Sequence, residues 1–373
     1  MLSVCVARHN KYDLPNFYSR SQVKDSSELS LADFCARAQT PLNRNLAGKS
    51  RGPADALRTV CWYRYLASKT QGISAYAFGK RVEPEGYKVD EINGRRIHSH
   101  SNKWIRYSQG RAVPQGALIA TADMKYPGSA AVINHPVWLL IERQFLSLDQ
   151  LNAVKSCFSP RVQIEIDAIK SLPPYKSPSF AIFEVKWIIL MDPLDALGAI
   201  AYLLCLAKLR DDTYAQACWV TCAYRAMLIH GPELRLLGIA LPMFELLKNN
   251  LLLAVKHNGE HWDYPTCHYL HAVELLVKFY ENQSSKRLEG QRFFIHETVV
   301  ARYGAASAIV TWPISVPAAE CWSAANVKAY EYRLLSLSRA LLALLREKPV
   351  LKPPTDDHFE SFSFVFEEMT RVK

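Results

Sequence analysis

Histidine and cysteine side chains gather in one short stretch near residue 260. Five potential metal ligands lie there within fifteen residues: His257, His261, Cys267, His268 and His271. Imidazole and thiolate are ligands that Zn²⁺ prefers, and His268 and His271 would share one face of a helix. Gly259 and Pro265 interrupt any single helix through the stretch, however, and the H-E-x-x-H spacing of a metalloprotease is absent. A zinc site and a polar loop with unrelated histidines are both open interpretations.

A second candidate combines carboxylates with a lysine. Asp167 is followed by Glu184 and Lys186, which flank Val185 in an apolar stretch. This order looks like the divalent-metal site of restriction-type nucleases, in which carboxylates hold Mg²⁺ and a lysine steadies the attacking water. A charged pair on the polar edge of a helix explains Glu184 and Lys186 equally well. Zinc and magnesium are thus the candidate cofactors, and neither is required.

The third candidate is a short basic and aromatic segment, residues 101–114. Trp104 and Tyr107 stand three apart, Gly110 follows them, and the apolar pattern then continues through Leu118, Ile119 and Ala122. The segment resembles the recognition helix and exit of the Cro/C1-type (XRE-like) helix-turn-helix family, over about residues 57–127. The resemblance implies that Trp104 and Tyr107 are buried, that Gly110 ends the helix in a left-handed conformation, and that the next helix packs behind them.

The same resemblance implies a set of residues that contact nucleic acid. The outward positions of the helix, which would reach bases and phosphates in a major groove, are Ser101, Asn102, Lys103, Ile105 and Arg106. Arg111 would lie over the phosphate backbone. The alternative is an aromatic helix that merely packs in a protein core.

The segment departs from the family pattern in two ways. Residues 82–100 replace the family's tight turn between its second and third helices, and Ser108-Gln109 replaces an acidic residue. Asn93-Gly94 inside the insertion predicts a β-hairpin. We expect this hairpin to carry Lys88, Arg95 and Arg96 at its edges, and Lys80 and Arg81 precede it. These cations complete the predicted nucleic-acid interface.

Positive charge is concentrated in the first third of the chain. The 373 residues have a formal net charge of +10, and residues 1–130 hold 20 Lys and Arg against 10 Asp and Glu, so they account for the whole surplus. A local surplus of this kind concentrates polyanions through counterion release. A charged solubilising face is the alternative explanation.

Export and membrane insertion are not indicated. Residues 1–11 lack the apolar core of a secretory signal, and the most apolar run, 194–207, is too short for a membrane span. Nine scattered cysteines suggest reduced, packed thiols rather than a disulfide framework. We therefore predict a cytoplasmic protein with no membrane partner.

Apolar periodicity predicts a mainly α fold. Helices are expected near 29–38, 53–71, 74–80, 102–109, 114–126, 148–158, 161–172, 192–209, 212–229, 232–256, 268–280 and 325–345, with a strand or helix at 180–190. We divide the chain into a polar arm with a short helix (1–52), a helix-turn-helix-like module with a possible hairpin insert (53–134), a larger helical domain (135–352) and a tail (353–373).

Three functions are compatible with these features. The leading one is a protein that binds nucleic acid, duplex DNA in particular, with a regulatory, mobile-element or phage-defence role and no enzymatic activity. The second is a Mg²⁺-dependent nuclease that uses Asp167, Glu184 and Lys186. The third is a scaffold subunit of a nucleoprotein complex that meets RNA or a partner. In each case the helical domain is expected to contact a protein partner or a second copy of the chain.

Overall fold

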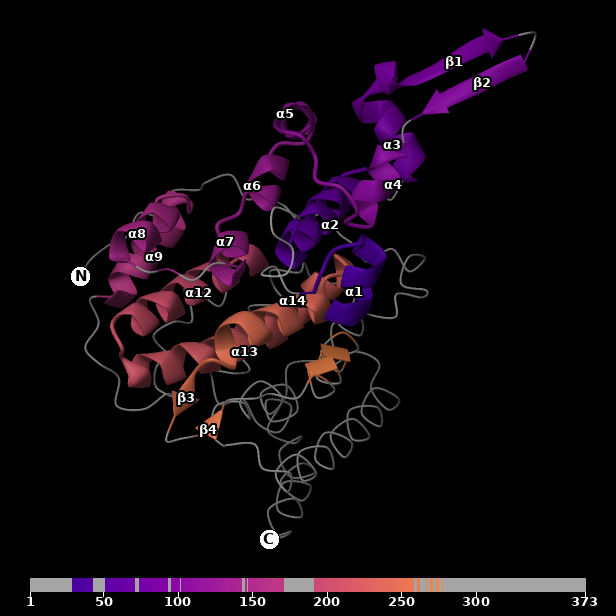
Figure 1. Cartoon of the computed structure of the whole chain (residues 1–373). Helices are drawn as coiled ribbons and strands as arrows, with labels where there is room; N and C mark the ends of the chain where they lie inside the picture. Colours follow the sequence, from indigo (N-terminus) through magenta and orange to yellow (C-terminus); the bar gives the residue numbers. More distant parts are fainter. Residues whose placement is uncertain are drawn as a thin grey trace, which may run out of the picture.

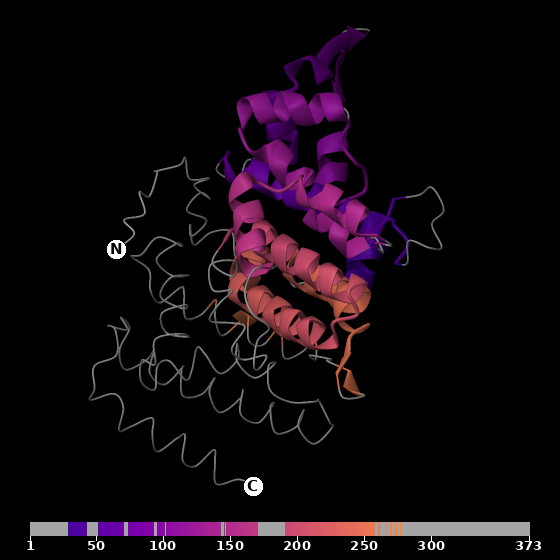
Figure 2. The same cartoon turned by 90° about the vertical axis from the view of Figure 1, so that its left-hand side faces the viewer.

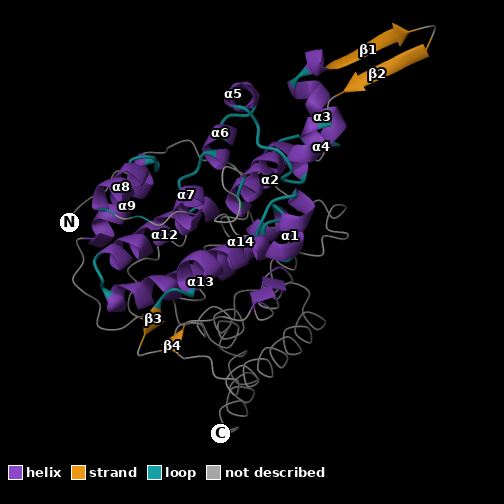
Figure 3. Cartoon of the chain, viewed as in Figure 1, coloured by secondary structure: helices purple, strands orange, loops and turns teal. Residues whose placement is uncertain are grey.

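The computed structural model describes residues 29–42, 51–70, 74–92, 95–100, 102–142, 145, 147–170 and 191–257, with a few positions between 260 and 277. This part of the chain is mainly α-helical (Figure 3). The helices are α1 (Leu31–Ala38), α2 (Pro53–Ser68), α3 (Ala75–Val82), α4 (Lys103–Ser108), α5 (Gly116–Lys125), α6 (Ser129–Ile133), α7 (Val137–Glu142), α8 (Leu148–Lys155), α9 (Pro160–Lys170), α12 (Pro193–Leu209), α13 (Thr213–Leu236) and α14 (Ala240–Leu247).

Local capping explains where the first helices begin. Ser30 and Ser74 each accept a hydrogen bond from the third residue of the helix that follows, α1 and α3 respectively. Pro53 opens α2, where its missing N–H would have had no partner in the helix. The predicted short helix near 29–38 and the helices from Pro53 and Ser74 are confirmed.

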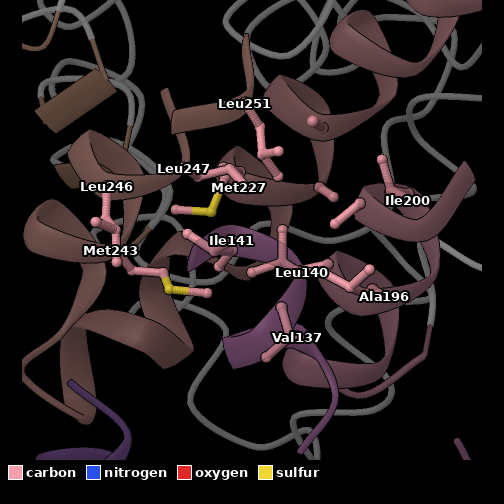
Figure 4. Packing of buried hydrophobic residues seen from close by; sticks show 14 of the residues in the cluster. Val137, Leu140, Ile141, Ala196, Ile200, Met227, Met243, Leu246, Leu247 and Leu251 are labelled. Atoms are coloured by element: carbon pink, nitrogen blue, oxygen red, sulfur yellow. The ribbon is translucent and has the colours of Figure 1, made fainter. Parts of the chain in front are cut away.

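The larger core surrounds α12 and α13. These two helices are joined by a tight turn at Asp211, whose φ is +53°, and α7, α14 and α8 pack around them (Figures 1 and 2). Leu140 and Ile141 of α7 meet side chains of α12, α13 and α14 in a continuous apolar cluster (Figure 4). The helix α7 lies in a stretch where no helix was predicted, and burial on this core explains why it forms.

Helix α13 differs from the prediction at Pro232. We expected a helix to end near Ile229 and a new one to start at Pro232, but α13 runs through Pro232 to Leu236. Every residue from Ala217 to Leu234 is buried, so packing on all sides outweighs the lost backbone hydrogen bond. The rest of the predicted 232–256 helix divides into α14 and a π-helical turn, Lys248–Leu252.

A second, smaller core is built on aromatic residues of α2, α3 and α4. Trp62, Tyr63 and Leu66 of α2 belong to it, whereas Leu57 and Cys61 on the same helix belong to the larger core. Helix α1, which lies in the predicted polar arm, also packs into the larger core: the backbone N–H of Leu31 donates to Glu245 of α14. The larger core therefore takes residues from both sides of the boundary predicted near residue 134, and α2 contributes to both cores.

The described elements also include a 3-10 turn, Pro84–Gly86, and two short antiparallel pairs of strands. Strands β1 (Tyr87–Ile92) and β2 (Arg95–His100) pair between α3 and α4 and project away from the helices (Figure 1). Strands β3 (Lys256–His257) and β4 (Glu260–His261) follow the π-helical turn. No helix within the described ranges has both the length and the apolar character needed to cross a membrane.

Candidate nucleic-acid interface

Helix α4 is anchored by the two aromatic residues that the sequence singled out. Trp104 and Tyr107 are 1% and 6% exposed, so the predicted buried pair is confirmed. The Trp104 ring stacks on Trp62 of α2, with centroids 5.6 Å apart, and meets Phe78 of α3 edge-on at 4.8 Å. These contacts fix the rotation of α4 about its own axis, and hence which of its residues face outward.

The exit from α4 requires a glycine. Gly110 has φ +69°, in the left-handed region, as predicted. A Cβ atom at this position would lie 3.0 Å from the carbonyl oxygen of Ala56 and 3.2 Å from its Cβ. The end of α4 is therefore pressed against α2 at Gly110.

Three outward positions of α4 have exposed side chains. Asn102 and Arg106 are exposed, and Ile105 between them is 40% exposed. Among the described residues the Arg106 side chain has no acidic partner. An amide, a guanidinium and an aliphatic group at adjacent outward positions can contact base edges and phosphates. Ser101, the remaining predicted outward residue, lies outside the described ranges.

Lys103 was predicted to face outward and contact nucleic acid, but its side chain pairs with a carboxylate of the protein. Its Nζ lies 2.5 Å from Oε1 of Glu83, and the side chain is only 33% exposed. The other oxygen of Glu83 accepts a 3.0 Å hydrogen bond from Nε1 of Trp104. A carboxylate twenty residues earlier in the chain thus holds Lys103 at the root of the hairpin.

Arg111 is likewise engaged inside the chain. Its Nε donates a 2.8 Å hydrogen bond to the carbonyl of Arg37, at the end of α1. The prediction placed Arg111 over a nucleic-acid backbone. The N–H groups at the tip of its guanidinium have no acceptor among the described residues.

Lys80 and Arg81 occupy the last turn of α3 and are exposed. Beside them, Nζ of Lys125 in α5 donates to the carbonyls of Arg81 and Val82, at 3.1 and 3.0 Å. Three cations therefore gather around the C-terminal end of α3, where the helix dipole favours positive charge.

The hairpin holds the remaining predicted cations at its two ends. In its register Arg95 lies opposite Ile92 and Arg96 opposite Glu91, at the tip, while Lys88 lies opposite Ser99 near the base. Because the hairpin projects from the body, its tip lies well away from α4 (Figure 1).

The other predicted sites lie only partly within the described residues. Asp167, a candidate Mg²⁺ ligand, is an exposed residue of α9 whose carboxylate lies 2.5 Å from Nζ of Lys155; Glu184 and Lys186 lie outside the described residues. His257 and His261 fall on β3 and β4, where His257 is opposite Glu260 rather than His261. Cys267, His268 and His271 are not among the described residues. Within the described part of the chain, no three His, Cys, Asp or Glu residues are placed to hold a metal.

A cavity of about 480 Å³ between α2, α6, the α8–α9 connection, the start of α12 and the end of α13 is a feature that sequence reasoning missed. Its lining is mostly apolar and includes His135, whose Nε2 lies 3.0 Å from Asp195. Nδ1 of His135 accepts a hydrogen bond from the Val137 N–H. Both ring nitrogens are thus engaged in holding α7 against α12, which is a structural role.

Sequence reasoning also missed three arginines near α4. Arg51, before α2, lies close enough to Arg106 for its pKa to be affected, and the carbonyl of Arg37 in α1 accepts the hydrogen bond from Arg111. Arg64 of α2 lies close to Arg37. The only signal for them in the sequence was the positive surplus of the first 130 residues. No spacing rule connects residues this far apart.

Comparison with protein-family models, curated proteins and solved structures finds no match to this chain.

Proposed function

We propose that this protein binds nucleic acid, and duplex DNA in particular, through α4 and the projecting hairpin. In this proposal α2, α3 and α4 act as a helix-turn-helix-like module with the hairpin inserted between α3 and α4. The observation that carries it is that the side chains of Asn102, Ile105 and Arg106 are exposed on one side of α4, while Trp104 and Tyr107 on its other side are buried.

The charge around the module supports the proposal. Arg106, Lys80 and Arg81 are exposed and have no acidic partner among the described residues. The hairpin adds Lys88, Arg95 and Arg96. Cations without partners in the protein gain most from phosphate, because they replace condensed counterions when they bind. Lys103 contributes less, because Glu83 already neutralises it.

The test is a binding assay on the full chain against duplex DNA, single-stranded DNA and RNA at several salt concentrations. The full chain is needed because α2 is part of both cores, so a fragment that ends near residue 134 would expose the α2 face that packs on α7 and α14. We expect the duplex to bind most tightly, with an affinity that falls steeply with salt.

Two variants and a matched control locate the interface. Asn102→Ala with Arg106→Ala, and separately Arg95→Ala with Arg96→Ala, should weaken binding and lower the salt slope by about 0.9 for each phosphate that is no longer neutralised. Arg161→Ala with Arg210→Ala removes two exposed charges from α9 and from the end of α12, away from the module, and should leave binding unchanged.

Two results would count against the proposal. Unchanged duplex binding by both interface variants would remove α4 and the hairpin from the interface. Preferential binding of RNA or single-stranded DNA would favour the scaffold function over a duplex reader.

A further inference from the structure

The C-terminal end of α1 attracts arginines from two other parts of the chain. The last carbonyls of a helix lack partners within the helix. At α1, Arg111 Nε donates to the carbonyl of Arg37, and Arg51 Nη2 donates to the carbonyl of Ala38. Because these carbonyls are consecutive, both guanidinium groups lie at the same end of one helix.

Three further arginines lie on the helices that meet here, Arg37 on α1, Arg64 on α2 and Arg106 on α4. Arg106 lies close enough to Arg51 for its charge to act there: burial is the main cause that lowers the pKa of Arg51, and Arg106 lowers it further. Although Arg64 is exposed overall, desolvation of its guanidinium lowers its pKa, and the nearby Arg37 adds to the effect. Helices α1 and α4 both pack against α2, so the segments that carry the five arginines are neighbours in the fold (Figure 1).

Little negative charge offsets this group. Asp55 is the acidic residue that acts on Arg51. Its carboxylate is already bound by Arg58, at 2.6 Å, and by the backbone N–H of Gly52, at 3.1 Å. No other carboxylate among the described residues pairs with these arginines, and the repulsion between Arg51 and Arg106 and between Arg37 and Arg64 remains.

Capping of α1 explains only a small part of the group. Two carbonyls need one donor each, whereas a guanidinium offers five N–H donors. Nε of Arg51 is buried and has no acceptor within the described residues. Among the described residues, the side chains of Arg37, Arg64 and Arg106 donate no hydrogen bond to the carbonyls at the end of α1. The planar forks of N–H donors that these guanidinium groups keep match the oxygens of phosphate groups.

We infer that the arginine cluster, Arg37, Arg51, Arg64, Arg106 and Arg111, binds phosphate groups of the nucleic-acid backbone beside α4. The inference rests on the proposed function and extends it, because the interface would continue from α4 across α2 to α1. The cluster would bind the charged backbone and would not distinguish one base sequence from another. A free phosphate compound has the same chemistry, so the experiment must separate the two sources.

The main variant is Arg37→Gln with Arg64→Gln in the full chain. Both side chains are exposed, and neither donates a hydrogen bond nor forms an ion pair with another described residue, so the fold should not change. For each phosphate that the variant no longer neutralises, duplex affinity at 0.15 M salt should fall about fivefold and the salt slope by about 0.9. Arg161→Gln with Arg210→Gln is the matched control and should change neither value.

A second variant tests the geometry of the forks. Arg51→Lys keeps the positive charge and one donor toward the carbonyl of Ala38 but loses the planar fork, so it should also weaken duplex binding. Thermal unfolding checks that this variant folds. Pyrophosphate, added to the wild type and to Arg51→Lys, reports whether the cluster takes a free phosphate compound.

The outcomes separate the cluster from the proposed function. If Arg95→Ala with Arg96→Ala weakens duplex binding but neither cluster variant does, the cluster inference is overturned and the proposed function stands. If no nucleic acid binds but pyrophosphate stabilises the wild type and not Arg51→Lys, the site takes a free phosphate compound and both the backbone assignment and the proposed function are wrong. If neither nucleic acid nor pyrophosphate binds, both proposals fail.

Discussion

The indole of Trp104 donates a hydrogen bond to Glu83, 3.0 Å away, across the junction between α3, the hairpin and α4. Glu83 is the C-terminal cap residue of α3, and Trp104 is the fully buried centre of the aromatic core. The same carboxylate pairs with Lys103. One side chain therefore joins the end of α3 to the start of α4, on either side of the insertion.

Removal of Glu83 should destabilise this junction. Glu83→Ala leaves the buried Trp104 N–H without an acceptor and should lower the free energy of unfolding by about 1–3 kcal/mol. Glu83→Gln keeps an acceptor and loses only the partly exposed ion pair with Lys103, so it should cost no more than about 1 kcal/mol. Urea unfolding followed by tryptophan fluorescence measures both values. Equal losses in the two variants would show that the indole hydrogen bond contributes little.

Gly110→Ala should destabilise the exit from α4. The left-handed backbone alone costs a residue with a Cβ about 1–2 kcal/mol. Gly238 provides the matched control, because its φ of +68° is nearly the same but a Cβ there would meet nothing within 4 Å. We expect Gly110→Ala to cost about 1–3 kcal/mol more than Gly238→Ala, because its Cβ would crowd Ala56. Thermal or urea unfolding gives the difference; identical losses would mean that α2 moves aside freely.

The close approach of α13 to Val273 can be tested by a paired substitution. A Cβ on Gly231 would lie 2.4 Å from Cγ2 of Val273. Gly231→Ala should therefore destabilise the fold by about 1–3 kcal/mol, although alanine is the better helix former. Addition of Val273→Ala makes room for the new methyl group, so the double variant should lose less stability than the sum of the two single variants. Additive losses in a denaturation experiment would contradict this contact.

Stability should fall in alkaline solution because of buried thiols. Burial raises the pKa of Cys61 and of Cys222 to about 12, from an ordinary value of 9.0. Below pH 9 the thiols are protonated in both states, and their stabilising effect is fully present. Above it the unfolded chain releases these protons while the folded chain keeps them, so the effect is lost as the pH rises toward 12, by about 1 kcal/mol per thiol between pH 9 and 10.

The control for this prediction is Cys61→Ala with Cys222→Ala. Tyrosines and lysines also titrate in this range, so the measured quantity is the difference between the two proteins in unfolding free energy against pH. The curve of the wild type should fall more steeply. Parallel curves would show that the two thiols ionise equally easily in both states.

Local sequence patterns predicted much of the module around α4. Pro53 and Ser74 marked helix starts, Gly110 marked a helix end, and the spacing of Trp104 and Tyr107 indicated a buried face. Each of these signals acts within about one helical turn, which is why it can be read from the chain alone. The same reasoning was wrong at Pro232, where the local preference to begin a helix yields to burial on all sides.

The amino-acid sequence by itself determined the helical character of the chain, the buried face of α4 and the amino-terminal surplus of positive charge. Only the tertiary structure decided which charges are free: Glu83 neutralises Lys103, and Arg111 reaches Arg37, 74 residues earlier in the chain, to complete the arginine cluster. The physical reason is the distance along the chain over which each interaction acts. Capping and periodicity act between near neighbours along the chain, whereas the pairing of a charge depends on which distant segments the two cores bring together.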